Sequence, residues 1–153
     1  MSVATVKARL VTIQQNITGV LTAYAQGPNS LSAANMPLFV NLTRKAEVDW
    51  KVFGSDMGLE TRLYAMQLYV MPFGQGVPGE AEEACELFFP LVRDTFAARP
   101  SLEQLLGVQE ATFLGDSGVI GLKYPLEGGS LYWGIEFRLQ VKEVVERTYA
   151  NSE

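Results

Sequence analysis

The chain has 153 residues, 12 basic and 17 acidic side chains, and no histidine. The excess of acidic side chains argues against a protein that binds the phosphates of nucleic acid. The lack of histidine argues against a metal site with nitrogen ligands. A chain of this length buries roughly 70% of the surface of its unfolded form, so we expect one domain over residues 1–153 without disulfide bonds.

Cysteine usage and hydropathy indicate where the chain is made. Cys85 is the only cysteine, so no intramolecular disulfide bond can form. The N-terminal residues do not resemble a secretion signal, and no stretch approaches the roughly 18 apolar residues of a membrane span. We therefore expect synthesis in the reducing cytoplasm of a host cell, and no contact with a membrane.

Charge is absent from a long segment near the N-terminus. Residues 10–43 contain no charged side chain, and the first acidic residue is Glu47. The cores of protein interfaces are depleted in charge, so this segment is a candidate for contact with other subunits. A buried helix followed by a polar surface loop explains the same pattern equally well.

The first half of the chain predicts one helix and three strands. Apolar residues at three- and four-residue steps predict a helix over residues 3–24, capped by Ser2. Residues 37–43 and 47–53 read as two strands joined by a hairpin through Arg44 and Lys45. Residues 60–71 predict a long strand that is apolar on both faces, and hence central in its sheet.

The second half repeats this order. Residues 80–99 predict a helix with a kink at Pro90, because proline removes a backbone donor and crowds the preceding turn. Residues 101–104 form a capping box for one short helical turn. Three strands follow at about residues 109–114, 119–126 and 131–142.

The last of these strands has the clearest pattern in the chain. Its odd-numbered residues from Leu131 to Val141 are apolar, while most of the even-numbered ones are polar. A period of two with one apolar face is typical of a half-buried antiparallel strand. The order α-β-β-β-α-β-β-β predicts an α+β fold, an antiparallel sheet of about five or six strands flanked by two main helices.

No catalytic or cofactor site emerges from the motifs. Residues 74–79 match GxGxxG, but Pro78 occupies the first helical turn and four glutamates follow where a pyrophosphate would bind. A nucleotide-binding enzyme that uses this loop is a distant alternative. The Gly-Asp-Ser-Gly sequence at 115–118 lacks the histidine of a serine protease, and Cys85 lies on an apolar helix stripe. We expect no enzymatic activity, no cofactor and no metal.

Aromatic side chains near turns are the remaining candidates for contact with a partner. Packing beneath the loops is the alternative role for them. The predicted contact elements are the hairpin around Arg44, Lys45 and Trp50 and the loop 73–79. Their candidate contact residues are Arg44, Lys45, Trp50, Phe53, Phe73, Gly74 and Gly76.

The layout resembles the tail terminator, or tail completion, family of long-tailed double-stranded DNA bacteriophages and gene transfer agents. The resemblance covers nearly the whole chain, and the segments that carry it are residues 6–24, 37–40, 61–71, 96–102 and 132–141. It implies a virion structural protein at the tail–neck junction that assembles as a homo-oligomeric ring, expected to be a hexamer. Such a ring caps the tail tube protein, ends tube polymerisation, offers a surface to the neck or head-completion protein, and lets DNA pass without sequence-specific binding.

Two related interpretations stay open at this level. A neck or head–tail connector protein shares much of the layout, and so does a tail tube subunit. A tube subunit stacks into long polymers, whereas a terminator forms a single ring.

Overall fold

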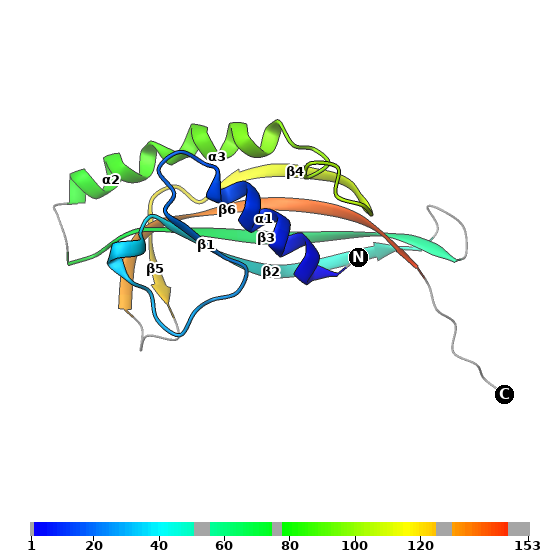
Figure 1. Cartoon of the computed structure of the whole chain (residues 1–153), viewed down its shortest axis with the longest axis horizontal. Coiled ribbons are helices and arrows are strands. Elements are labelled where there is room, and N and C mark those ends of the chain that lie inside the picture. Colours follow the sequence, from blue (N-terminus) through cyan, green and yellow to red (C-terminus); the bar gives the residue numbers. More distant parts are fainter. Residues whose placement is uncertain (1, 51–55, 75–77, 125–129, 147–153) are drawn as a thin grey trace.

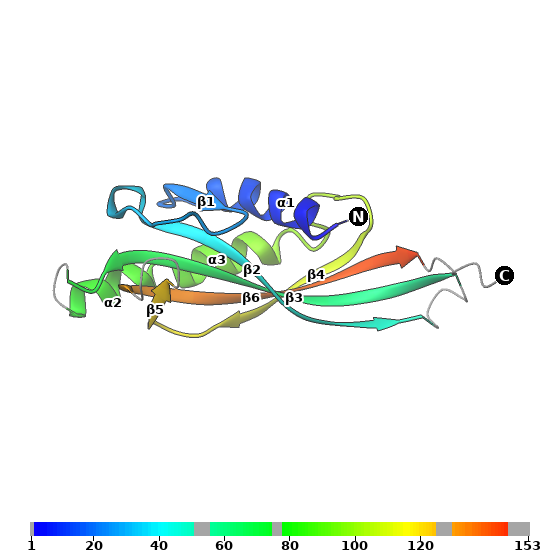
Figure 2. The same cartoon turned by 90° about the horizontal axis from the view of Figure 1, so that it is seen from below.

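The computed structural model describes residues 2–50, 56–74, 78–124 and 130–146 of the chain (Figure 1). Within these residues a six-stranded sheet packs against the helices α1 (Val3–Gln15), α2 (Pro78–Glu86) and α3 (Phe88–Ala97). Figure 2 shows α1 on one side of the sheet, and buried side chains of α1, α2 and α3 join one core with the sheet. The predicted α+β class is confirmed.

The sheet is mixed, which corrects the prediction of a purely antiparallel one. Its strands are β1 (Thr22–Tyr24), β2 (Leu38–Asp49), β3 (Met57–Pro72), β4 (Val108–Asp116), β5 (Ile120–Tyr124) and β6 (Ser130–Glu146). They follow the order β1-β2-β3-β6-β4, and β5 also pairs with β6. β1 runs parallel to β2, while the other pairs are antiparallel.

Helix α1 is shorter than predicted. Ser2 caps it as expected, accepting a hydrogen bond from the Thr5 backbone at 3.3 Å, but the helix ends at Gln15 rather than near residue 24. Gly19 takes a φ of 93°, which glycine adopts without the clash that a Cβ causes. The chain then turns into β1, so the apolar spacing beyond Ile17 reflects burial outside a helix.

The predicted hairpin at Arg44 and Lys45 is wrong, because β2 is one continuous strand. Its register with β3 shifts between Thr43 and Ala46, so the two basic residues sit in a bulge. The Arg44 carbonyl accepts a hydrogen bond from Arg62 Nη1 at 3.0 Å. The true hairpin joins β2 to β3, and β3 is long enough to pair with β2 on both sides of the bulge.

The predicted helix 80–99 is split in two. α2 ends at Glu86 and α3 begins at Phe88, so Pro90 is the third residue of α3. A proline in the first turn removes a donor that has no partner within its own helix. The break thus precedes the proline, where α3 starts.

The short helical turn predicted after α3 is left-handed in the structure. Ser101 Oγ accepts from the Gln104 backbone at 2.9 Å, as a capping box requires. However, Leu102, Glu103 and Gln104 have φ values of 51°, 59° and 61°, in the left-handed region. Arg9 of α1 donates to the Leu102 and Glu103 carbonyls at 3.0 and 3.1 Å, and the Leu102 side chain is fully buried. These contacts hold a backbone conformation that is costly for residues other than glycine.

The main core lies between the helices and the sheet. On β6 it contains Ile135, Phe137, Leu139 and Val141, which are fully buried as the alternation predicted. The first residue of that pattern, Leu131, is instead 45% exposed. Its neighbour Tyr132 is buried on the opposite face.

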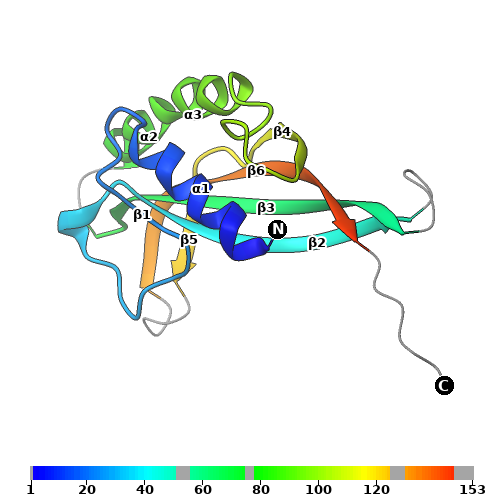
Figure 3. The same cartoon turned by 45° about the vertical axis from the view of Figure 1, so that its right-hand side comes forward.

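A second, smaller core occupies that opposite face near β5. Tyr69 makes edge-to-face contacts with Tyr124 and Tyr132, at ring-centre separations of 5.9 and 5.6 Å. β2, β3 and β6 extend beyond the helices at the other end of the sheet (Figures 1 and 3).

Candidate assembly surface

The predicted contact residues do not form one patch. Arg44 and Lys45 lie midway along the sheet, Trp50 follows the end of β2, and Phe73 and Gly74 follow the end of β3. β3 has 16 residues, which span about 50 Å, so Trp50 and Phe73 belong to opposite ends of the sheet. Phe53 and Gly76 lie outside the described residues.

Arg44 is tied to the face of the sheet that the helices leave open. Its Nη2 is 3.0 Å from Glu136 Oε1, which also accepts from Gln67 Nε2 at 3.0 Å. Arg138 Nε lies 3.8 Å from the other Glu136 oxygen. Lys45 is exposed beside this network and lines a hollow of about 380 Å³ with it. This part of the surface is positively charged at its rim.

The two aromatic candidates have clear packing roles. A Cβ added to Gly58 would lie 2.6 Å from the Trp50 ring, so Trp50 covers that glycine. Phe73 stacks on Trp133 with ring centres 4.2 Å apart and is still 39% exposed. Packing beneath the loops, the alternative role considered from the sequence, therefore accounts for these two contacts.

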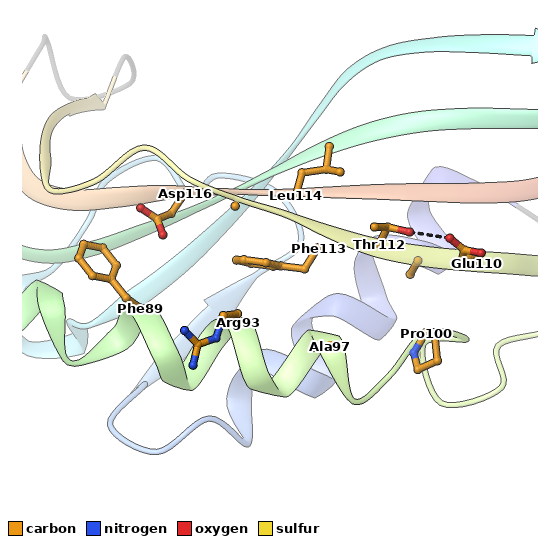
Figure 4. Close-up of a pocket in the computed structure, with 11 residues that line it drawn as sticks. Phe89, Arg93, Ala97, Pro100, Glu110, Thr112, Phe113, Leu114 and Asp116 are labelled. Atoms are coloured by element: carbon orange, nitrogen blue, oxygen red, sulfur yellow. Dashed lines mark hydrogen bonds between the residues drawn. The ribbon is translucent and has the colours of Figure 1, made fainter.

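A groove runs between α3 and β4 (Figure 4). Its volume is about 580 Å³, and its lining combines apolar and charged side chains from both elements. The labelled residues that line it are Phe89, Arg93, Ala97, Pro100, Glu110, Thr112, Phe113, Leu114 and Asp116. Figure 4 shows Phe89 projecting from α3 toward Asp116 of β4, while Arg93 lies along the helix below Phe113.

The outer edge of β4 carries no further strand along this groove, and α3 lies alongside it (Figures 1 and 3). The Ala111 backbone donates to the Pro100 carbonyl at 2.6 Å, which occupies the edge at that residue. Beyond Ala111, the backbone of residues 112–116 pairs with β6. It makes no backbone-to-backbone hydrogen bond to any other part of the chain that the structure describes. An unpaired strand edge can add a further strand.

A second open edge lies at the other side of the sheet. β1 covers β2 only from Leu38 to Val40. For residues 41–48, the described part of the chain provides backbone-to-backbone hydrogen bonds only from β3. The sheet therefore presents two different unpaired edges, one on β2 and one on β4. Sequence reasoning missed both, because strand order is not readable from periodicity.

The glycine-rich loop has no feature of a phosphate site in its described part. α2 begins at Pro78 and carries Glu80 in its first turn, as the sequence indicated. Glu82, Glu83 and Glu86 follow along the same helix. A bound phosphate would face this negative charge, which opposes the attraction of a helix N-terminus for anions.

Buried titratable groups are few and scattered among the described residues. Burial raises the pKa of the Cys85 thiol to about 11, so the thiolate that would act as a nucleophile is disfavoured. In residues 2–50, 56–74, 78–124 and 130–146, no three His, Cys, Asp or Glu side chains are grouped so that they could hold a metal ion.

Glu143 is a buried carboxyl that sequence reasoning missed. The predicted strand ended at residue 142, but β6 continues to Glu146 and places Glu143 opposite Glu60. Glu143 Oε1 and Tyr64 Oη have no hydrogen-bond partner among the described residues. Burial, and then the charge of Glu60, raises the pKa of Glu143, and burial followed by the charge of Glu143 raises the pKa of Tyr64. Continuing the alternation of β6 by one step would have found this position.

Comparison with known proteins adds no relative to this description. Searches against family models and against curated proteins found no match to the chain. Within the described residues, none of the helices is both long and apolar enough to span a membrane. The functional argument therefore depends on the sheet, its edges and the surfaces beside them.

Proposed function

We propose that the chain is a structural virion protein of the tail terminator type. It assembles as a ring on the last ring of the tail tube, ends tube polymerisation and provides the surface to which the neck docks. The observation that carries this proposal is the pair of different open edges, on β2 and on β4 of one sheet.

Two different edges favour a head-to-tail contact between copies. A contact between unlike surfaces leaves one of each unused in a dimer, so further copies add until the assembly closes as a ring or continues as a filament. A terminator requires the closed outcome. The resemblance in layout to tail terminators favours the ring, with a hexamer as the expected size.

The charge of the chain supports the same role. A net charge of −5 gives little attraction for DNA phosphates, which suits a ring through which DNA must pass. The proposal requires no catalysis, cofactor or metal. The partners are then further copies of the chain, the tail tube protein and the neck protein.

Deletion of the gene from its parent phage or transfer element tests this function. Electron microscopy of the resulting particles should show overlong or irregular tails that are separate from DNA-filled heads. The same gene supplied from a plasmid is the control and should restore tail length and joining. Tails of normal length that fail to join would instead assign the chain to the neck, and missing tails would make it a tube or initiation component.

A further inference from the structure

We infer that neighbouring copies of the chain join through the β2 edge of one copy and the β4 edge of the next. This inference rests on the proposed function, in which copies of the chain form a ring. It specifies which surfaces of neighbouring copies meet. The occupant of the groove beside β4 is then residues 42–48 of a second copy. Strand directions, heights, side chains and charges of the two edges support the assignment.

The strand directions are compatible. β2, β3, β6 and β4 are consecutive antiparallel neighbours, so β2 and β4 run in opposite directions. When a second copy is placed beside the first in the same orientation, its β2 meets β4 as an antiparallel partner. Copies in a ring share one orientation relative to the ring axis, so a single type of contact continues the sheet from copy to copy.

The two open segments also lie at similar heights in the sheet. Phe113 pairs with Leu139, Leu139 with Tyr64, and Tyr64 with Thr43, so one row crosses from β4 to β2. A rotation about a ring axis contains no shift along that axis. When the strands run nearly parallel to the ring axis, the open part of β4 meets the open part of β2 without a large change of register.

The side chains on the helix side of β2 suit the groove. Ala46 and Val48 pair with Arg62 and Glu60, which lie on the same face as the buried Tyr64. Val48 is 41% exposed in the single chain, an apolar side chain at an open edge. The pair rows place Val48 level with Val108, so next to β4 of another copy it would meet the chain near Pro100, at the end of the groove. Its burial there would stabilise the contact.

The bulge of β2 and the edge of β4 carry opposite charges, although Glu47 of β2 lies in the same row of pairs as Glu110 of β4 and Arg93 lines the groove. β4 carries Glu110 and Asp116 and no basic residue. The bulge of β2 presents Arg44 and Lys45, both exposed. Opposite charges across an interface favour the matched pair of edges, whereas two β4 edges would bring acidic residues together.

Cross-linking between two single-cysteine variants tests the contact. Leu114→Cys is mixed with Lys45→Cys in the purified full-length protein and treated with a short bismaleimide, whose reach tolerates a small change of register. Leu114 and Lys45 also line one hollow within a single chain, so each variant must carry only one of the two changes. The native Cys85 is fully buried and its raised pKa disfavours its thiolate, so it leaves the background low.

We expect a covalent dimer in the mixture and none in either variant alone. Leu131→Cys, at a residue that is 45% exposed on β6, replaces Leu114→Cys as the matched control and should give no product with Lys45→Cys. A dimer from Leu114→Cys alone would indicate a contact between two β4 edges and overturn the inference. A chain that stays monomeric at every concentration would also overturn it, because the contact is proposed between copies of this chain alone.

A substitution at the edge gives a second readout. Val48→Asp should weaken self-association by about tenfold or more, because it places a charge in the groove. Leu131→Asp, an equivalent change away from both edges, should leave association unchanged. Equal effects of the two variants would contradict the contact. If cross-linking fails while gene deletion still yields overlong tails, the edge contact is wrong and the terminator function stands; normal tails and heads after deletion would remove the function itself.

Discussion

Gln14 of α1 and Asn41 of β2 form a reciprocal amide pair inside the core. Gln14 Nε2 donates to Asn41 Oδ1 at 2.7 Å, and Asn41 Nδ2 donates to Gln14 Oε1 at 2.9 Å. Both side chains are fully buried, and Asn41 Nδ2 also donates to the Tyr24 carbonyl at 3.0 Å. One pair of polar residues thus fixes α1, β1 and β2 relative to one another.

Breaking this amide pair should destabilise the fold. Gln14→Leu leaves the Asn41 amide short of a donor and an acceptor, so we expect a loss of about 1–3 kcal/mol in the free energy of unfolding. Urea denaturation followed by circular dichroism measures it. The double variant Gln14→Leu/Asn41→Leu should lose less than the sum of the two single variants, because no unpaired amide remains between the two positions. Additive losses would show that the pair is not coupled.

Glu143 should make stability depend on pH. Its pKa in the folded chain is raised, so folding favours its protonated form. Its contribution to stability is therefore fully present below the ordinary pKa of glutamate, about 4.3, and is lost as pH rises through the raised value. At pH 8, Glu143→Gln should be more stable than the native chain, because glutamine cannot ionise and folding then carries no cost of burying a carboxylate.

The advantage of Glu143→Gln should shrink as the pH is lowered toward about 4.3, when the native carboxyl is protonated too. Thermal unfolding at a series of pH values measures this trend. Glu146→Gln is the matched control, since Glu146 lies on the same strand but is exposed. A constant difference between Glu143→Gln and the native chain at all pH values would contradict the assignment.

Gly134 should not tolerate a side chain. A Cβ at this position would lie 2.2 Å from the Leu68 carbonyl oxygen and 2.6 Å from Leu122 Cδ1. The first of these atoms belongs to the backbone of a central strand and cannot move alone. Gly134→Ala should therefore cost about 1–3 kcal/mol, as overpacked cores do. Gly74→Ala, where nothing lies within 4 Å of the added carbon, should change stability by less than about 0.5 kcal/mol.

Trp50 and Phe73 test the loop contacts expected from the sequence. Each alanine substitution removes aromatic packing, on Gly58 or on Trp133, so we expect a stability loss of about 1 kcal/mol. As contact residues they should also reduce tail joining in complemented deletion particles. Leu106→Ala, at a side chain that is 91% exposed, controls for loss of apolar surface. The contact hypothesis is lost if both variants fold, form rings and join tails normally.

Local sequence signals were enough to predict the α+β class and most of the main elements. The alternation from residue 133 to 141 predicted the buried face of β6, because a period of two leaves only one apolar side. The capping role of Ser2 and the positions of β3, β4 and β5 followed from equally local signals. Composition alone excluded histidine-based chemistry, because the chain contains no imidazole.

Contacts between residues far apart in the chain settle what local patterns leave open. Residues 22–24 have helical spacing but join β2 as a parallel strand, and Arg44 and Lys45 form a bulge instead of a turn. Both outcomes depend on pairing with distant residues, which outweighs local preference. The open edges of β2 and β4, and the burial of Glu143, follow from strand order and register. These are set by the packing of whole elements against each other, and no window of sequence encodes them.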